Sequence, residues 1–176
     1  MSKTSVLFLC AHNTTRSQMA EAFLRVHGGR RFEAYSAGLV PGERDPLVAA
    51  VMRERGISLA GQRPKSIREY RGKQRFDYVI TVCSLSERRC PAFAGMGTRL
   101  TWPFEDPAAC QGGRSERLEK YREIRDAIER FIVGWLRTLS PSDGERPRVP
   151  SARGSAGPAA GDRRGLARTG SATGAP

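Results

Sequence analysis

One stretch decides the fold of this chain: Ser5-Val6-Leu7-Phe8-Leu9-Cys10-Ala11-His12-Asn13-Thr14-Thr15-Arg16-Ser17. An apolar run ends at Cys10, Arg16 follows after five intervening residues, and a helix-forming sequence begins near Ser17. A strand, a short loop and a helix N-terminus direct backbone N–H groups toward one point, where the helix dipole favours negative charge. The stretch therefore predicts an anion cradle between Cys10 and Ser17.

Cys10 and Arg16 have the side chains that chemistry in such a cradle requires. The planar Arg16 guanidinium can bind an oxyanion in bidentate fashion, and the positive field favours the thiolate of Cys10. A cysteine at a strand end is often only a small buried residue. The combination of strand, cysteine, loop, arginine and helix instead favours a nucleophile directed at a tetrahedral oxyanion.

The composition sets the broad class of the protein. The 176 residues, of which 39% are hydrophobic, suffice for one domain with one core. We find no run of about 18 apolar residues and no secretory leader, so we expect no membrane span and a cytoplasmic protein. The formal charge of +12 is dispersed, so nucleic acid is not the expected partner, although this charge would attract a small anionic substrate.

The chain contains four cysteines, at positions 10, 83, 90 and 110. Structural disulfides are not expected in a reducing compartment, and neither the cysteine spacing nor the two histidines fits a zinc site. We therefore expect no metal site and assign the cysteines to redox or nucleophilic chemistry.

Strands alternate with helices through residues 1–139, which we expect to form the only folded domain. The predicted strands cover residues 5–10, 31–36, 76–82 and 98–102. The predicted helices begin near Ser17, at Pro46 after an Asp45 cap, and after a Ser115 cap. This alternation predicts a doubly wound α/β fold: a central parallel sheet of about four strands with helices on both faces.

Ligands of such folds bind beyond the carboxyl ends of the strands. Cys10 and Cys83 both lie at predicted strand ends, so we expect them at one edge of the sheet. Residues 140–176 differ from the rest because they are rich in glycine, proline and arginine and poor in large aliphatic side chains. We expect this tail to be disordered, since it cannot bury enough surface to offset its ordering entropy.

Three further segments accompany the loop: Ser36-Ala37-Gly38, Cys83-Ser84-Leu85-Ser86-Glu87-Arg88-Arg89-Cys90-Pro91 and Trp102-Pro103-Phe104-Glu105-Asp106-Pro107. With the loop, they make residues 4–138 resemble the thioredoxin-coupled arsenate reductases, a family built on the low-molecular-weight protein tyrosine phosphatase fold. The Cys-x5-Arg-Ser loop is typical of the wider superfamily. Gln18-Met19-Ala20-Glu21 and the pair Cys83 and Cys90 are typical of the reductase branch.

The resemblance implies that the protein reduces arsenate to arsenite in arsenic detoxification. Arsenate would be held by the cradle residues Ala11, His12, Asn13, Thr14, Thr15 and Arg16. Cys10 would attack arsenic, Ser17 would assist its thiolate, and Asp106 would protonate the leaving oxygen.

The resemblance also implies a relay of three thiols. Cys83 would attack Cys10 and release arsenite, and Cys90 would then attack Cys83. External thioredoxin would reduce the resulting disulfide, without a bound cofactor, and we expect the protein to be a monomer. Cys110 has no place in the relay and is interpreted as a bystander.

Some members of this family hold a potassium ion near the loop with an asparagine, a glutamate, a serine and an aspartate. Asn13, Glu21 and Ser36 match the first three, and Lys65 stands at the position of the aspartate. Because a lysine ammonium can replace the ion, we expect no potassium dependence.

Two alternative functions are open at this stage. A phosphatase acting on phosphotyrosine or a small phosphate ester would use Cys10, Arg16 and Asp106 and leave the other cysteines idle. A non-enzymatic redox-sensing or anion-binding module is the second alternative, and the intact set of three residues argues against it.

Overall fold

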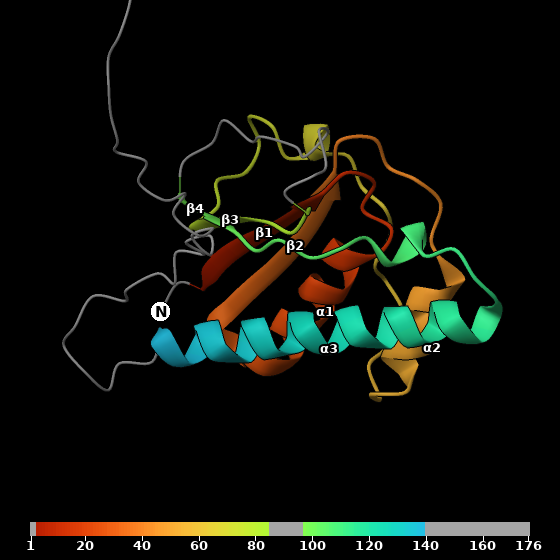
Figure 1. Ribbon diagram of the computed structural model, residues 1–176. Helices are drawn as coiled ribbons and strands as arrows, with labels where there is room; N and C mark the ends of the chain where they lie inside the picture. Colours follow the sequence, from red (N-terminus) through yellow and green to blue (C-terminus); the bar gives the residue numbers. More distant parts are fainter. Residues whose placement is uncertain (1–2, 85–96, 140–176) are drawn as a thin grey trace, which may run out of the picture. The chain divides into compact units, whose positions relative to one another are not determined.

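The computed structural model describes residues 3–84 and 97–139, which include a four-stranded parallel sheet (Figure 1). The strands are β1 (Thr4–Cys10), β2 (Phe32–Gly38), β3 (Tyr78–Thr81) and β4 (Thr98–Thr101), and their order in the sheet is β2-β1-β3-β4. The helices are α1 (Arg16–Gly28), α2 (Pro46–Arg53) and α3 (Arg114–Thr138), with short 3-10 helices η1 (Gly29–Arg31), η2 (Ile67–Glu69) and η3 (Pro107–Ala109). The predicted α/β class and parallel sheet are confirmed, whereas Cys90 and the predicted tail, residues 140–176, lie outside the described residues.

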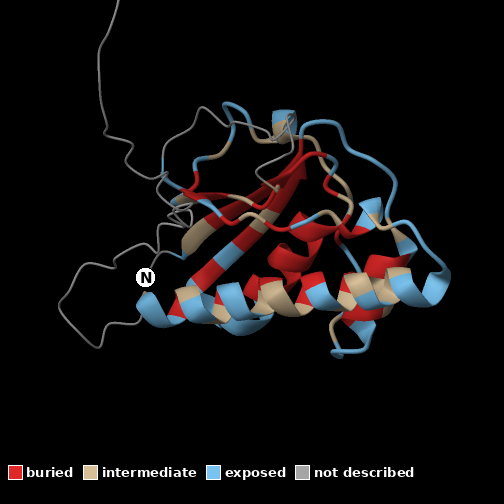
Figure 2. Cartoon of the chain, viewed as in Figure 1, coloured by how far each residue is buried: buried red, intermediate tan, exposed pale blue. Residues whose placement is uncertain are grey.

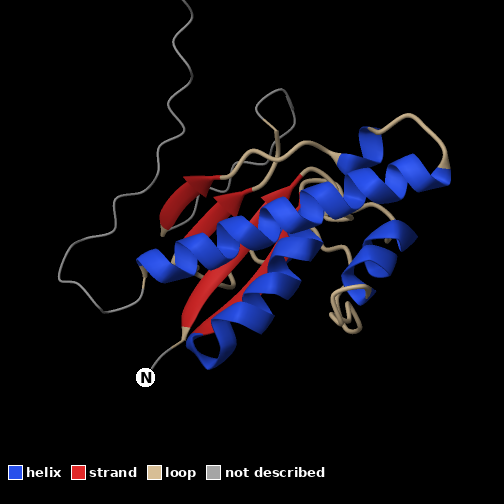
Figure 3. Ribbon diagram, turned by 60° about the horizontal axis from the view of Figure 1, so that its bottom comes forward, coloured by secondary structure: helices blue, strands red, loops and turns tan. Residues whose placement is uncertain are grey.

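The two faces of the sheet are covered differently. The three described α-helices lie on one face of the sheet (Figures 2 and 3). Side chains of β1 and β3 such as Phe8 and Ile80 belong there to one buried cluster with residues of all three helices. On the other face, Leu7 and Val79 pack against the η2 region and the turn that follows it, including Tyr70. We expected helices on both faces; in the described residues, the second face has only a 3-10 helix and loops.

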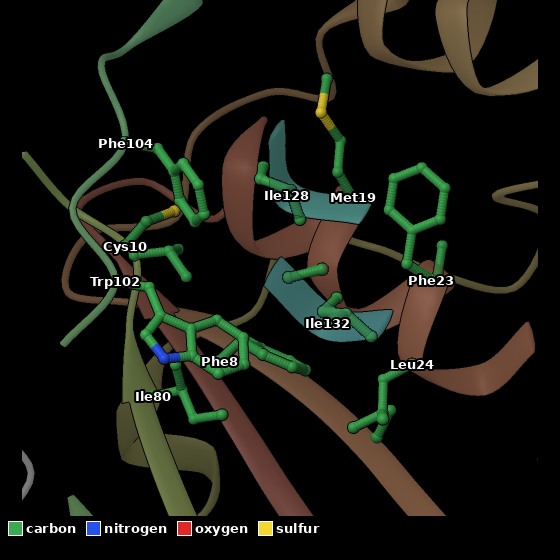
Figure 4. Close-up of a cluster of buried hydrophobic side chains, with 14 of the residues drawn as sticks. Phe8, Cys10, Met19, Phe23, Leu24, Ile80, Trp102, Phe104, Ile128 and Ile132 are labelled. Atoms are coloured by element: carbon green, nitrogen blue, oxygen red, sulfur yellow. The ribbon is translucent and has the colours of Figure 1, made fainter. Parts of the chain in front are cut away.

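Helix α3 packs on the core through one side, where Tyr121, Ile128 and Ile132 are fully buried; Figure 4 shows the two isoleucines within the core cluster. The prediction that Ser115 caps this helix is wrong. The helix begins at Arg114, and the backbone N–H of Gly113 donates to Glu116 Oε2 at 2.7 Å. A carboxylate in the first turn therefore satisfies the N-cap backbone and leaves Ser115 inside the helix.

The predicted cap of α2 is present. Asp45 accepts a 2.9 Å hydrogen bond from the backbone N–H of Leu47, and Pro46 occupies the first helical position. Tyr121 donates its hydroxyl to the same carboxylate, and burial together with Asp45 raises the pKa of Tyr121 above its ordinary value. This pair connects α3 to the loop that leads into α2.

The order of the strands identifies the edge where a ligand would bind. The chain leaves β1 for β2 on one side and returns to β3 on the other, so the connections diverge at the carboxyl ends of β1 and β3. Leu9 pairs with Thr81, and Val82 N donates to Leu9 O at 2.8 Å. Cys10 thus ends β1 and Cys83 follows the neighbouring β3, so both lie at one edge of the sheet, as the sequence predicted. No helix among residues 3–84 and 97–139 is long and apolar enough to span a membrane.

Candidate active site

The oxyanion cradle, residues 11–16, connects the end of β1 to the first turn of α1. Asn13 has a φ of 54°, a left-handed conformation that asparagine tolerates better than most residues. This conformation directs the Asn13 N–H to Cys10 Sγ, at 3.2 Å. Thr15, the N-cap residue, makes no side-chain cap hydrogen bond, so its hydroxyl does not occupy the N–H groups of the first turn of α1.

Cys10 is buried at one end of the core cluster shown in Figure 4. Its sulfur lies 2.9 Å from Ser17 Oγ, and Ser17 Oγ accepts a 2.8 Å hydrogen bond from Asn13 Nδ2. Because this contact supplies a hydrogen to Ser17 Oγ, the hydroxyl can direct its own hydrogen to Cys10. A thiolate at Cys10 would accept hydrogen bonds from both Ser17 and Asn13.

Arg16 brings the cradle together with the loop that follows β4. Its buried guanidinium donates to Phe104 O at 3.0 Å, and its Nη2 lies 3.4 Å from Asp106 Oδ2. Asp106 also caps η3, since Oδ1 accepts from Ala108 N at 3.1 Å. Asp106 is therefore both a turn residue and a neighbour of Arg16, and its side chain, 31% exposed, reaches solvent.

The loop that holds Asp106 is also fastened to α3. Lys120 Nζ lies 2.6 Å from Glu105 Oε2, and the hydrogen bond from Lys120 lowers the pKa of Glu105. Glu105 is largely exposed, so this ion pair is worth little by itself. Rings add to the attachment, because the centroids of Phe104 and Phe131 are 5.1 Å apart.

The end of β2 supports the cradle from the other side. Ala11 O accepts the N–H groups of Leu39 and Val40, at 2.9 and 3.1 Å, and His12 O accepts that of Gly42 at 3.0 Å. The His12 side chain is exposed, with Nδ1 3.2 Å from Val40 O. His12 therefore takes part in the cradle through its backbone rather than through its side chain.

Of the three other cysteines, Cys83 and Cys110 lie in the described part of the chain. Cys83 is 1% exposed and belongs to the same buried cluster as Cys10. Cys90 is outside the described residues. Cys110 is half-buried at the end of η3, and its sulfur lies 4.0 Å from the Gln111 carbonyl.

The four residues matched to a potassium site do lie together. Lys65 Nζ is 3.5 Å from Glu21 Oε2, and Ser36 donates its hydroxyl to the same carboxylate oxygen. Asn13 Nδ2 donates to Ser36 Oγ at 2.9 Å, and Asn13 Oδ1 accepts the Lys65 N–H at 2.8 Å. The Lys65 ammonium thus supplies positive charge beside Glu21.

One residue that the sequence did not predict as part of the site, Gln62, contacts the start of α1. Gln62 is buried and donates to Gln18, 44 positions earlier in the chain. Nothing in the local sequence around Gln62 indicates this contact, because it forms only when the loop after α2 returns to the start of α1.

Comparison with known proteins agrees with this geometry. The family model described as "Low molecular weight phosphotyrosine protein phosphatase" matches residues 5–143. An arsenate reductase of Bacillus licheniformis is 35% identical over 138 residues, which are 78% of this chain and 99% of that protein. A solved arsenate reductase in the phosphate binding state is 28% identical, with a TM-score of 0.65 over 78% of this chain and 99% of its own. A thioredoxin-dependent arsenate reductase of Corynebacterium glutamicum is 30% identical, with a TM-score of 0.57 over 78% of this chain and 62% of its own.

Proposed function

This chain belongs to the low molecular weight phosphotyrosine protein phosphatase family, in the branch of the arsenate reductases, and from that premise we propose that it reduces arsenate to arsenite with Cys10 as the nucleophile. The observation that supports this best is the contact of Cys10 Sγ with Ser17 Oγ and with the backbone N–H of Asn13, in the same loop that carries the buried Arg16 guanidinium. A cysteine sulfur that receives these hydrogen bonds, in a loop that also supplies an arginine fork, would be arranged to attack a tetrahedral oxyanion.

In the first step, the cradle N–H groups and Arg16 would bind arsenate, and the Cys10 thiolate would attack arsenic. A sulfur–arsenic bond forms, one arsenic–oxygen bond breaks, and Asp106 donates the proton with which that oxygen leaves as water. Asp106 is suited to this role because it lies next to Arg16 and still reaches solvent, from which it can regain a proton.

The second step distinguishes a reductase from a phosphatase. The Cys83 thiolate would attack the Cys10 sulfur, and the electron pair of the sulfur–arsenic bond would pass to arsenic, which leaves as arsenite. Arsenic gains two electrons and the two thiols become a disulfide. The position of Cys83 supports this step, because it follows the strand adjacent to that of Cys10 and joins the same buried cluster.

The third step would regenerate Cys10. Cys90 would attack the Cys83 sulfur, forming a Cys83–Cys90 disulfide and freeing the Cys10 thiolate. We propose thioredoxin, in the cytoplasm, as the external dithiol that reduces this disulfide. The similarity to the thioredoxin-dependent reductase of Corynebacterium glutamicum supports that choice.

Phosphate ester hydrolysis is the second candidate function, since Cys10, Arg16 and Asp106 could also cleave a phosphate monoester. The matched family is described as a phosphotyrosine phosphatase, which supports this second function. In that reaction water would resolve the covalent intermediate, and Cys83 and Cys90 would be idle.

Coupled turnover separates the two functions. NADPH oxidation is followed with arsenate, thioredoxin and thioredoxin reductase for the wild type, Cys83→Ser, Cys90→Ser and the control Cys110→Ser. We expect the first two variants to lose multiple turnover and the control to keep it. Full turnover by Cys90→Ser would contradict the relay, and rapid p-nitrophenyl phosphate hydrolysis without arsenate reduction would favour the phosphatase.

A further inference from the structure

We propose that Gln62 is a positioning residue for the oxyanion cradle, acting through the Gln18 amide on Asn13. The proposal rests on the assignment of the Cys10 loop as the reactive site. It concerns how that loop is held in shape, by side chains that do not touch the oxyanion.

Gln62 begins the chain of contacts. It follows Gly61, whose φ is 82°, in the turn after α2, and its side chain is buried. Its Nε2 donates twice to one residue, at 2.9 Å to Gln18 Oε1 and at 3.0 Å to Gln18 O. Both amide hydrogens of Gln62 are therefore directed at Gln18.

These donors determine which way the Gln18 amide points. With Gln62 Nε2 facing Gln18 Oε1, the opposite end of the amide, Nε2, faces Asn13 O at 3.1 Å and Asn13 Oδ1 at 3.2 Å. Arg63 O, at 3.0 Å, is a further acceptor for Gln18 Nε2. A reversed amide would place two donors against each other at Gln62 and two acceptors against each other at Asn13.

Asn13 is where this orientation affects the chemistry. It is the only non-glycine residue with positive φ in the described part of the chain, and its N–H is the one that reaches Cys10 Sγ. Gln18 binds both its carbonyl oxygen and its side-chain oxygen, while its Nδ2 donates to Ser17 and Ser36. Loss of the Gln18 contacts would release the Asn13 carbonyl and side chain, and the φ and ψ angles of Asn13 could then change and turn its N–H away from the sulfur.

Two substitutions at Gln62 test whether its amide donors orient Gln18, one by removing the donors and the other by replacing them with an acceptor. Gln62→Met keeps the approximate volume and removes the donors, so the orientation of Gln18 is no longer enforced. Gln62→Glu replaces the donors by an acceptor, which repels Gln18 Oε1 and favours the reversed amide. The proposal therefore predicts a larger effect for the glutamate variant than for the methionine variant.

The experiment uses the full chain and measures the alkylation rate of Cys10 with iodoacetamide, read from the peptide that contains Cys10 by mass spectrometry. The rate is measured from about pH 5 to about pH 9 with and without inorganic phosphate, whose protection gives a dissociation constant. In Gln62→Met we expect phosphate to bind about tenfold more weakly and the alkylation profile to move to higher pH. The exposed Gln111→Met is the control and should behave as wild type.

A double-mutant cycle tests the route through Gln18. If Gln62 acts through that amide, Gln62→Met adds little to a Gln18→Met variant, whereas independent effects would multiply. The proposal would be overturned if the effects of the two substitutions multiplied in the double variant. It would also be overturned if Gln62→Met left the pH profile of alkylation and the dissociation constant of phosphate unchanged. If Gln62→Glu fails to fold, Gln62→Met and the cycle still decide. Failure of arsenate reduction itself is a separate result, since alkylation of Cys10 requires no oxyanion.

Discussion

Gly38→Ala is the substitution that should damage the oxyanion cradle most directly. Gly38 ends β2 and pairs in register with Cys10. Its φ is not in the positive region, so an alanine could adopt the same backbone conformation. Space is what excludes a side chain: a Cβ would lie 2.8 Å from both Asn13 N and His12 C, and 2.9 Å from Ala11 O.

The size of the effect follows from which atoms collide. All three are backbone atoms of the cradle, so no side chain can rotate away, and one segment must move. Gly38 is held on its other side by a 2.8 Å hydrogen bond from its N–H to Lys65 O. Overpacking of this kind costs about 1–3 kcal/mol. If the cradle absorbs the displacement, phosphate and arsenate should bind about 10-fold to 100-fold more weakly.

The assay separates loss of binding from loss of folding. Phosphate affinity is measured by calorimetry, the KM for arsenate by coupled turnover, and the melting temperature by scanning calorimetry. Gly134→Ala is the matched control, because Gly134 lies within α3 and a Cβ there meets no atom within 4 Å. We expect it to stabilise the protein by about 0.5–1 kcal/mol without changing phosphate affinity. A Gly38→Ala protein with wild-type phosphate affinity and arsenate KM would refute the reasoning.

Three further predictions concern charge. Arg16→Lys removes the bidentate fork but keeps the charge, so arsenate reduction should fall at least about tenfold in kcat/KM, and unchanged kinetics would exclude the role of Arg16. The hydrogen bond from Arg122 is the chief cause that lowers the pKa of Glu54 to about 2. The ionised Glu54 therefore stabilises the folded protein fully above pH 4.5, and this stabilisation is lost as the pH falls toward 2. The stability difference between wild type and Glu54→Gln should therefore be constant at neutral pH and shrink below pH 4.5 in urea denaturation, and a difference independent of pH would contradict this. Because Lys65 Nζ lies 3.5 Å from Glu21, exchanging sodium for potassium should change neither melting temperature nor arsenate turnover, whereas a clear gain with potassium would show that the ammonium does not replace an ion.

The features that depend only on residues close together in the sequence could be predicted from it. A strand that ends at Cys10 and a helix that begins at Arg16 are local features, and so is the Asp45 cap. The cap of α3 was misplaced because two candidates compete within one turn. Ser115 has a capping side chain, but the Glu116 carboxylate reaches back to Gly113, and a glycine at the cap position has no side chain to reveal it.

The contacts that hold the oxyanion cradle in shape could not be predicted in this way, because they join distant parts of the chain. Phe104 lies 88 positions from Arg16, and Lys65 lies 52 positions from Asn13. Such contacts exist only after β1, β2 and β4 have taken their places in one sheet. The Cys-x5-Arg loop thus carries the proposed nucleophile and the arginine fork, while their geometry depends on the folded domain. It follows that residues far from the loop in sequence, such as Gly38 and Gln62, should affect oxyanion binding as strongly as residues within it.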